Sequence, residues 1–221
     1  MLVIFDLEGV LVDGEFLPEL AKLKGNYDEI LDITLKGIRG EIDWMTGLLT
    51  RIDKLKGIHY NDCVKVANNI PYTLGAKQLC DSLKKMGCKL VVVSGGPTIL
   101  ANRAQKDLNI DYVFANELIF KNDFLESIDI QVTADKANSI YKLVQDLEKP
   151  KNEIITVVDG MNDLTLLNMA GLRFAFCAPP QVEYKADIII KKKDLREILP
   201  YISNLFNQSQ PNSSFNLIKN S

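Results

Sequence analysis

The sequence predicts an α/β fold in which a doubly wound parallel sheet carries a small helical cap inserted after its first strand. Short apolar runs at 2–7, 89–93 and 154–158 are typical of parallel strands buried on both faces. Segments with helical periodicity separate the later runs, as the crossovers of a parallel sheet require. Between residues 14 and 72 apolar residues recur only at helical spacing, which predicts the insertion.

The predicted insertion consists of several short helices, because glycines at 25, 37, 40 and 57 interrupt its periodic pattern. We therefore expect a catalytic core formed by residues 1–13 and 73–206 and a helical cap domain over residues 14–72. The segment 207–221 is rich in Asn, Ser and Gln and is predicted to be a disordered tail.

After residue 73 the sequence alternates between helical patterns and short apolar runs. The predicted helices cover 74–86, 98–108, 135–147, a segment ending at 170, and 195–206. The predicted strands cover 89–93, 111–115, 154–158, 174–177 and 187–190. A hairpin is predicted from 118–120 and 124–127, joined by a turn at 121–123.

Composition and charge exclude several classes of function. The 221 residues carry a net charge of −3, which favours neither nucleic acid nor an acidic membrane surface. No apolar stretch approaches ~18 residues and no secretory leader is recognisable, so we expect a cytoplasmic protein. The four cysteines have no CxxC spacing and there is one histidine, which disfavours a zinc site and predicts reduced thiols.

Polar residues follow three of the predicted strands, where each strand ends. The carboxyl ends of the strands of a doubly wound sheet converge on one crevice, so we expect these side chains to lie close together. They are Asp6 and Glu8 after 2–7, Ser94 to Gly96 after 89–93, and Asp159 to Asp163 after 154–158, with Lys136 at the start of a helix.

These residue types suit the transfer of a phosphoryl group. Buried carboxylates need a compensating cation, and oxygen ligands are those that Mg²⁺ prefers, so Asp6 and Asp159 are predicted to bind Mg²⁺. A carboxylate can also act as a nucleophile toward phosphorus. Ser94 and the glycine amides after it form an anion site, and Lys136 supplies a positive charge for phosphoryl oxygens. We therefore expect a small phosphate monoester as the partner.

Four segments, taken together, resemble the motifs of the haloacid dehalogenase superfamily, and within it the phosphoserine phosphatase family. They are Asp6-Leu7-Glu8-Gly9-Val10, the Ser94 turn, Lys136 and Asp159-Gly160-Met161-Asn162-Asp163. The resemblance extends over residues 1–203 and includes flanking stretches such as Phe114-Ala115-Asn116. It implies a Rossmann-like core and hydrolysis of O-phospho-L-serine to L-serine and phosphate.

The resemblance also implies the roles of the core residues. Asp6 would be the nucleophile that accepts the phosphoryl group. Glu8 would protonate the leaving alkoxide, then activate water, and would place its backbone carbonyl on Mg²⁺. Ser94, the Gly95 amide and Lys136 would hold the phosphate.

Further roles are implied for residues around the metal and in the cap. Asp159 would bind Mg²⁺ directly, and Asp163 would support the metal site. Asn162 would contact bound substrate. Two cap residues, Glu15 and Arg51, occupy positions where the family recognises the amino and carboxylate groups of the substrate.

Chemistry supports this assignment of the cap residues. Arginine pairs bidentately with a carboxylate, and a glutamate can pair with an ammonium group. Trp44 is expected to shield the site from water, whether or not it also belongs to the apolar interior of the cap.

Two departures from the family pattern leave alternatives open. Glu8 stands where the family usually has Asp, and Val158 replaces a common glycine. Some relatives that carry the Asp-Leu-Glu-Gly form transfer the phosphoryl group to a second alcohol such as homoserine. The alternatives are therefore such a phosphotransferase, a phosphatase for another small ester, and a catalytically inactive binding protein. The residues do not distinguish a monomer from a homodimer.

Overall fold

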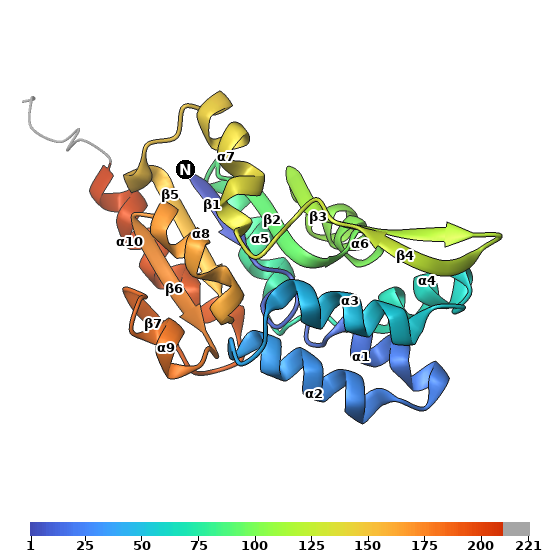
Figure 1. Ribbon diagram of the computed structural model, residues 1–221. Helices are drawn as coiled ribbons and strands as arrows, with labels where there is room; N and C mark the ends of the chain where they lie inside the picture. Colours follow the sequence, from blue (N-terminus) through green and yellow to red (C-terminus); the bar gives the residue numbers. More distant parts are fainter. Residues whose placement is uncertain (210–221) are drawn as a thin grey trace, which may run out of the picture.

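A computed structural model describes residues 1–209, and it has a seven-stranded sheet with helices on both faces and a group of helices at the carboxyl end of its central strands (Figure 1). The strand order is β4-β3-β2-β1-β5-β6-β7, and every neighbouring pair is parallel except β3 and β4. The strands are β1 (Leu2–Phe5), β2 (Lys89–Pro97), β3 (Tyr112–Lys121), β4 (Phe124–Asp129), β5 (Ile154–Val158), β6 (Leu172–Phe176) and β7 (Ile188–Ile190). The predicted fold class is confirmed.

The helices fall into two groups. Between β1 and β2 lie α1 (Phe16–Ala21), η1 (Lys22–Lys24), α2 (Tyr27–Ile38), α3 (Trp44–Leu55) and α4 (Tyr60–Asn69). The others are α5 (Ala76–Lys85), α6 (Thr98–Leu108), α7 (Lys136–Asp146), η2 (Lys151–Glu153), η3 (Met161–Asp163), α8 (Leu164–Met169), α9 (Pro180–Glu183), η4 (Leu195–Ile198) and α10 (Leu199–Ser209).

Strand β1 explains why its run of residues is continuously apolar. Val3 and Phe5 point to the face covered by α5, α6 and η4, whereas Leu2 and Ile4 point to the face covered by α7 and α8. All four side chains are fully buried. A parallel strand with both faces covered has no solvent side on which a polar residue could be placed.

The insertion between β1 and β2 is entirely helical. Helices α1, α2, α3 and α4 pack on one another through buried side chains such as Leu20, Ile30 and Leu48. Helix α3 starts where Asp43 accepts a hydrogen bond from the Thr46 N–H at 2.8 Å, which satisfies a free amide of the first turn. These helices lie beside the end of the sheet at which β1 and β5 finish (Figure 1).

The hairpin of β3 and β4 is confirmed, but it is longer than predicted. The predicted strands 111–115 and 118–120 form one strand, β3, because Asn116 and Glu117 continue the extended backbone. The turn residues Asn122 and Asp123 have left-handed backbone angles, φ 51° and 67°, which Asn and Asp tolerate better than most residues.

The hairpin also reaches the inserted helices, which the sequence did not predict. Leu125 exchanges backbone hydrogen bonds with Gly57 and Ile58, each at 2.8 Å, and the Tyr60 N–H donates to the Asp123 carbonyl at 2.8 Å. In Figure 1 the tip of the hairpin lies next to α4. The inserted helices therefore contact the β3–β4 hairpin as well as the helices of the core.

Other boundaries differ by a few residues. Strand β1 ends at Phe5 rather than at 7, and β2 continues through the Ser94-Gly95-Gly96 segment with a shift in its pairing to β3. The last predicted helix divides into η4 and α10, next to Pro200, whose ring is tolerated only in the first helical turn. Helix α10 continues to Ser209, past the predicted start of the tail at 207, and residues 210–221 lie outside the described residues.

The cysteines are all free thiols, as predicted, with Cys177 exposed and the other three buried. Among residues 1–209, none of the helices combines the length and apolarity that crossing a lipid bilayer requires.

Candidate active site

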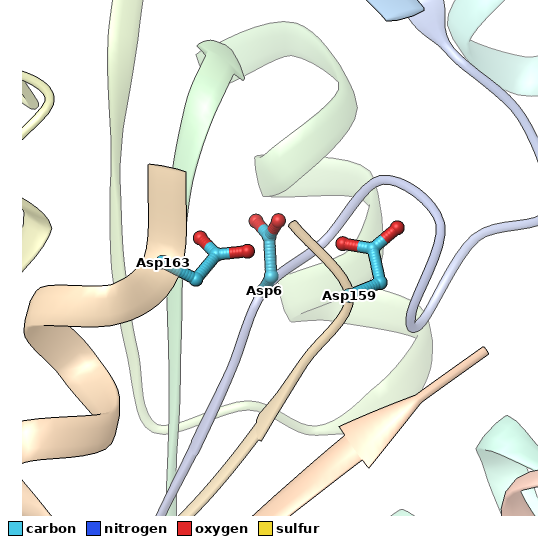
Figure 2. Close-up of side chains that lie close together, drawn as sticks. All are labelled: Asp6, Asp159 and Asp163. Carbon is cyan, nitrogen blue, oxygen red and sulfur yellow. The ribbon is translucent and has the colours of Figure 1, made fainter. Parts of the chain in front are cut away.

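Three carboxylates meet at the carboxyl end of the sheet. Asp6 follows β1 and Asp159 follows β5, and these strands are paired neighbours, with Phe5 opposite Val157. Asp163 comes from η3. One oxygen from each of the three lies within 4.8 Å of the other two, and Figure 2 shows the carboxylates turned toward one another. The predicted convergence of strand ends therefore brings these three acids together.

Lys136 is the cation of this cluster. It is the first residue of α7, its side chain is only 1% exposed, and its Nζ lies 2.9 Å from Asp6 Oδ1 and 2.5 Å from Asp163 Oδ1. Burial lowers the pKa of Lys136, but the charges of Asp163 and Asp6 outweigh burial and leave the pKa above its usual value. Lys136 is therefore protonated at neutral pH.

One lysine does not balance three acids. Burial and the Asp6 charge raise the pKa of Asp163 to about 7, although Lys136 and the Gly160 N–H oppose the shift. Burial, and then Asp6 and Asp163, raise the pKa of Asp159 well above its usual value. A cluster that disfavours its own ionisation and offers only oxygen donors fits a hard divalent cation such as Mg²⁺.

Gly9 makes room for this cluster. A Cβ at Gly9 would lie 1.9 Å from Asp159 Oδ2, and the residue has a left-handed φ of 78°. Both observations require glycine at this position. The neighbouring Val158 is fully buried against the α7–α8 face, where it takes the place of the family's common glycine.

The Ser94-Gly95-Gly96 segment of β2 lines the same cavity as Asp6 and Asp159. Ser94 is 1% exposed, and its Oγ accepts a hydrogen bond from the Gly96 N–H at 3.0 Å. The Gly95 carbonyl accepts from the amide of Asn116 at 2.9 Å. The Trp44 ring covers Gly95, because a Cβ there would lie 3.2 Å from two ring atoms. The segment is thus fixed by Asn116 of β3 and covered by Trp44 of the inserted helix α3.

Glu8 bridges the turn and the inserted helices. Its Oε1 accepts the Phe16 N–H at 2.6 Å, at the start of α1. Its Oε2 lies over Gly96, where an added Cβ would be only 2.1 Å away. Burial raises the pKa of Glu8 to about 6, and the hydrogen bond from Phe16 partly offsets the shift.

Glu15 and Arg51 line the same cavity from the helical insertion. Burial raises the pKa of Glu15 well above its usual value, and the charges of Glu8 and Asp159 raise it further. Burial lowers the pKa of Arg51, and Glu8 and Glu15 oppose that shift. Within residues 1–209, no carboxylate lies at ion-pair distance from Arg51.

One cavity collects nearly all the predicted site residues. Its lining includes Asp6, Glu8, Glu15, Arg51, Ser94, Gly95, Lys136, Asp159 and Asn162. Asp163 does not line the cavity, but its carboxylate forms an ion pair with Lys136, which does. The Asn162 Oδ1 atom is buried without a hydrogen-bond partner among the described residues. A bound molecule or ion would satisfy this atom, because buried polar atoms otherwise find partners.

The sequence reasoning missed several lining residues. Most are apolar or glycine, namely Leu17, Ile33, Gly37, Ile38, Gly47 and Leu48. The exception is Thr34, which is polar and 3% exposed. The sequence does contain a signal for Thr34. It lies between Ile30 and Ile38 at a spacing of four, so a polar residue occupies the apolar face of a predicted helix.

Comparisons with known proteins agree with this geometry. The model of the haloacid dehalogenase-like hydrolase family matches residues 1–171. The phosphoserine phosphatase of Methanocaldococcus jannaschii is 36% identical over 205 residues, which cover 91% of this chain and 97% of the relative. The phosphoserine phosphatase of Campylobacter jejuni subsp. doylei is 35% identical over 204 residues, 91% of this chain and 99% of the relative.

Solved structures give the same result. A phospho-aspartyl intermediate analogue of phosphoserine phosphatase and a substrate-bound phosphoserine phosphatase each superpose with a TM-score of 0.87 at 34% identity. In both, the match covers 90% of this chain and 97% of the other. Since sequence and fold agree along most of its length, this chain belongs to the haloacid dehalogenase-like hydrolases, in the phosphoserine phosphatase family.

Proposed function

We propose that this protein hydrolyses O-phospho-L-serine to L-serine and phosphate through an aspartyl phosphate on Asp6. The observation that carries the proposal is the arrangement of Asp6, Lys136 and Asp159 at the end of the sheet, in a cavity that also holds Glu15 and Arg51. The relatives named above are phosphoserine phosphatases, which supports the same substrate.

The proposed reaction has two steps, and Glu8 acts in both. In the first, an oxygen of Asp6 bonds to phosphorus, the bond from phosphorus to the serine oxygen breaks, and Glu8 gives that oxygen its proton. In the second, Glu8 takes a proton from water while the water oxygen attacks phosphorus and releases Asp6. A pKa of about 6 allows Glu8 to donate and accept a proton near neutral pH.

Three groups would hold the phosphate while these bonds change. Ser94 supplies a hydroxyl, Gly95 a backbone amide and Lys136 a positive charge. Phosphoryl transfer depends mainly on position and on stabilising charge on the phosphoryl oxygens, so these contacts account for much of the expected rate increase.

The metal is proposed to be Mg²⁺. When bound, it supplies positive charge beside the phosphoryl group. Asp6, Asp159 and the Glu8 backbone carbonyl would hold it, with Asp163 in support, since oxygen donors and excess negative charge meet there.

The cap residues would bind the amino-acid part of the substrate. We propose that Arg51 binds the carboxylate of phosphoserine, Glu15 its ammonium group, and Asn162 a further substrate atom. Residues 14–72 would form the mobile cap, with Trp44 closing over Gly95 to exclude water during the first step. The free cysteines support the proposed cytoplasmic location, and the protein would act as a monomer or a homodimer.

Glu8 favours one alternative, the transfer of the phosphoryl group to a second alcohol. The usual Asp is one carbon shorter, and here the longer carboxylate is anchored to the Phe16 N–H at 2.6 Å. A displacement of this size at the catalytic acid can change which nucleophile it activates. The acceptor would be a small alcohol such as homoserine.

The test is release of phosphate from O-phospho-L-serine beside a panel of small phosphate esters, with Mg²⁺ and with EDTA. Mg²⁺-dependent preference for phosphoserine is expected. The same assay with added homoserine tests the alternative, because transfer would lower phosphate release and form phosphohomoserine. Turnover of generic esters without preference for phosphoserine would contradict the substrate assignment, and no turnover would indicate a binding protein.

A further inference from the structure

Hydrogen bonds orient Arg51, which has no carboxylate at ion-pair distance within residues 1–209. Its guanidinium makes two hydrogen bonds: Nε donates to the Gly47 carbonyl at 3.1 Å, and Nη1 donates to the Thr34 hydroxyl at 2.9 Å. The first partner lies one turn earlier on the same helix, α3. The second lies on α2, so the hydrogen bond to Thr34 connects Arg51 to another helix.

The Thr34 hydroxyl is itself fixed in direction. It donates its hydrogen to the Ile30 carbonyl at 2.8 Å, one turn earlier on α2. With its only hydrogen used, the oxygen presents a lone pair to Arg51. Thr34 is 3% exposed, so water does not compete for this contact. The pair therefore has a single arrangement of donor and acceptor.

This arrangement leaves part of the guanidinium for a ligand. A guanidinium carries five N–H groups, and the two hydrogen bonds leave both hydrogens of Nη2 and one of Nη1. A planar donor group held at two atoms presents its remaining edge in one direction, which suits a carboxylate that accepts two parallel hydrogen bonds.

We propose that Thr34 is a positioning residue for carboxylate recognition, which aims Arg51 at the carboxylate of the substrate. The inference rests on the proposed function, since it takes the serine carboxylate as the ligand of Arg51. Thr34 would act on the affinity for carboxylate-bearing esters and leave the phosphoryl chemistry at Asp6 unchanged, because it contacts neither the nucleophile nor the phosphate site.

Three variants separate this role from a general effect on the helix. Thr34→Val keeps the shape and removes the hydroxyl, whereas Thr34→Ser keeps the hydroxyl. Thr50→Val is the matched control, because Thr50 makes the same bond to the carbonyl one turn earlier, Thr46 at 2.7 Å, but is exposed. Each variant would be assayed with O-phospho-L-serine and with phosphoethanolamine, which has the amine and phosphate but no carboxylate.

We expect Thr34→Val to raise KM for phosphoserine about tenfold with kcat nearly unchanged, and to leave phosphoethanolamine kinetics within about twofold. Thr34→Ser and Thr50→Val should behave as the unaltered enzyme does with both esters. An equal loss on both esters, or no change with phosphoserine, would overturn the role of Thr34. Melting temperatures would show whether a variant is simply less well folded.

A second readout needs no substrate. Phenylglyoxal modifies accessible arginines, and peptide mapping by mass spectrometry measures the rate at Arg51. Faster labelling in Thr34→Val than in Thr34→Ser supports the inference, and equal labelling contradicts it. If the unaltered enzyme shows no preference for phosphoserine over phosphoethanolamine, the proposed function fails, and the labelling rate alone then decides whether Thr34 holds Arg51.

Discussion

Asp159 carries an unfavourable charge in the metal-free site. Partial burial and the neighbouring charge of Asp6 raise the pKa of its carboxyl group, so that at neutral pH ionisation opposes folding. A bound cation would stabilise the ionised carboxylate, so that ionisation would then favour folding. The charge of Asp159 therefore suits the metal-bound protein and costs the metal-free protein stability.

A thermal-unfolding experiment tests this balance. Asp159→Asn removes one negative charge, so the metal-free variant should melt at a higher temperature than the metal-free parent. Mg²⁺ should raise the melting temperature of the parent and have little effect on the variant. The exposed Asp53→Asn serves as control and should keep the parent's response to Mg²⁺. A metal-free variant less stable than the parent would contradict this account.

Glu8 gives a second prediction at this scale. Glu8→Asp shortens the side chain by one carbon and separates the carboxylate from the Phe16 N–H that it accepts at 2.6 Å. We expect kcat for phosphoserine to fall about tenfold or more, with a smaller change in KM, because proton transfer depends on position. Steady-state kinetics measure both constants. An unchanged kcat would show that the site does not depend on the longer side chain.

At the scale of elements, Asn116 on β3 links three segments. Its side chain is fully buried, and its amide donates to the carbonyls of Gly95 at 2.9 Å and Val132 at 3.1 Å. Its Oδ1 accepts from the backbone N–H groups of Gln131 and Val132, each at 2.8 Å. One side chain thus joins the Ser94-Gly95-Gly96 segment of β2 to the segment that leads to Lys136 on α7.

Replacement of Asn116 should therefore affect stability and catalysis together. Asn116→Ala leaves buried backbone groups without partners, which should cost about 3 kcal/mol or more in the free energy of unfolding. We also expect kcat/KM to fall about tenfold for every phosphate ester, including generic aryl phosphates. Denaturation and kinetics measure these effects, with the exposed Asn68→Ala as control. A loss confined to phosphoserine would contradict the role.

The elements also show what the sequence could predict. Strand β5 lies where it was predicted, because a run of β-branched residues between turn signals has one interpretation. The end of β2 was missed because Gly-Gly-Pro is typical of a turn, whereas here pairing with β3 keeps it extended. Thr34 was missed because its partner Arg51 lies on another helix, and the packing of α2 on α3 has no local sequence signal.

For the whole molecule, the most consequential unpredicted feature is the contact between the inserted helices and the β3–β4 hairpin. The β3–β4 hairpin exchanges backbone hydrogen bonds with Gly57 and Ile58, and the His59 and Phe124 rings pack edge to face at 5.3 Å. If residues 14–72 move as a cap, the hairpin must bend with them or these bonds must break. We infer that the hairpin limits how far the cavity opens.

The residue that precedes η4, Asp194, makes the stability of the fold depend on pH. Asp194 is 2% exposed, and its side-chain hydrogen bonds with Arg196 lower its pKa from 3.8 to about 2. Its Oδ1 also lies close to Gly75, where a Cβ would be 2.8 Å away. A lowered pKa contributes stability that is fully present above the unfolded value and is lost as pH falls toward the folded value.

Asp194→Asn should accordingly be less stable than the parent at neutral pH, and the difference should shrink as pH falls through the range between 3.8 and about 2. Urea denaturation at neutral pH and near the lower end of this range measures the difference. A difference that stays constant with pH would show that the charge of Asp194 does not stabilise the fold.

Trapping of the phosphoenzyme tests most directly whether Asp6 accepts the phosphoryl group. Acid quenching during turnover of O-phospho-L-serine that is radiolabelled in the phosphoryl group should leave label on the protein. Peptide mapping should place that label on Asp6. Asp6→Asn should fold as the parent does, by its melting temperature, yet show neither label nor turnover. Retained turnover in Asp6→Asn, or label on another residue, would contradict the account.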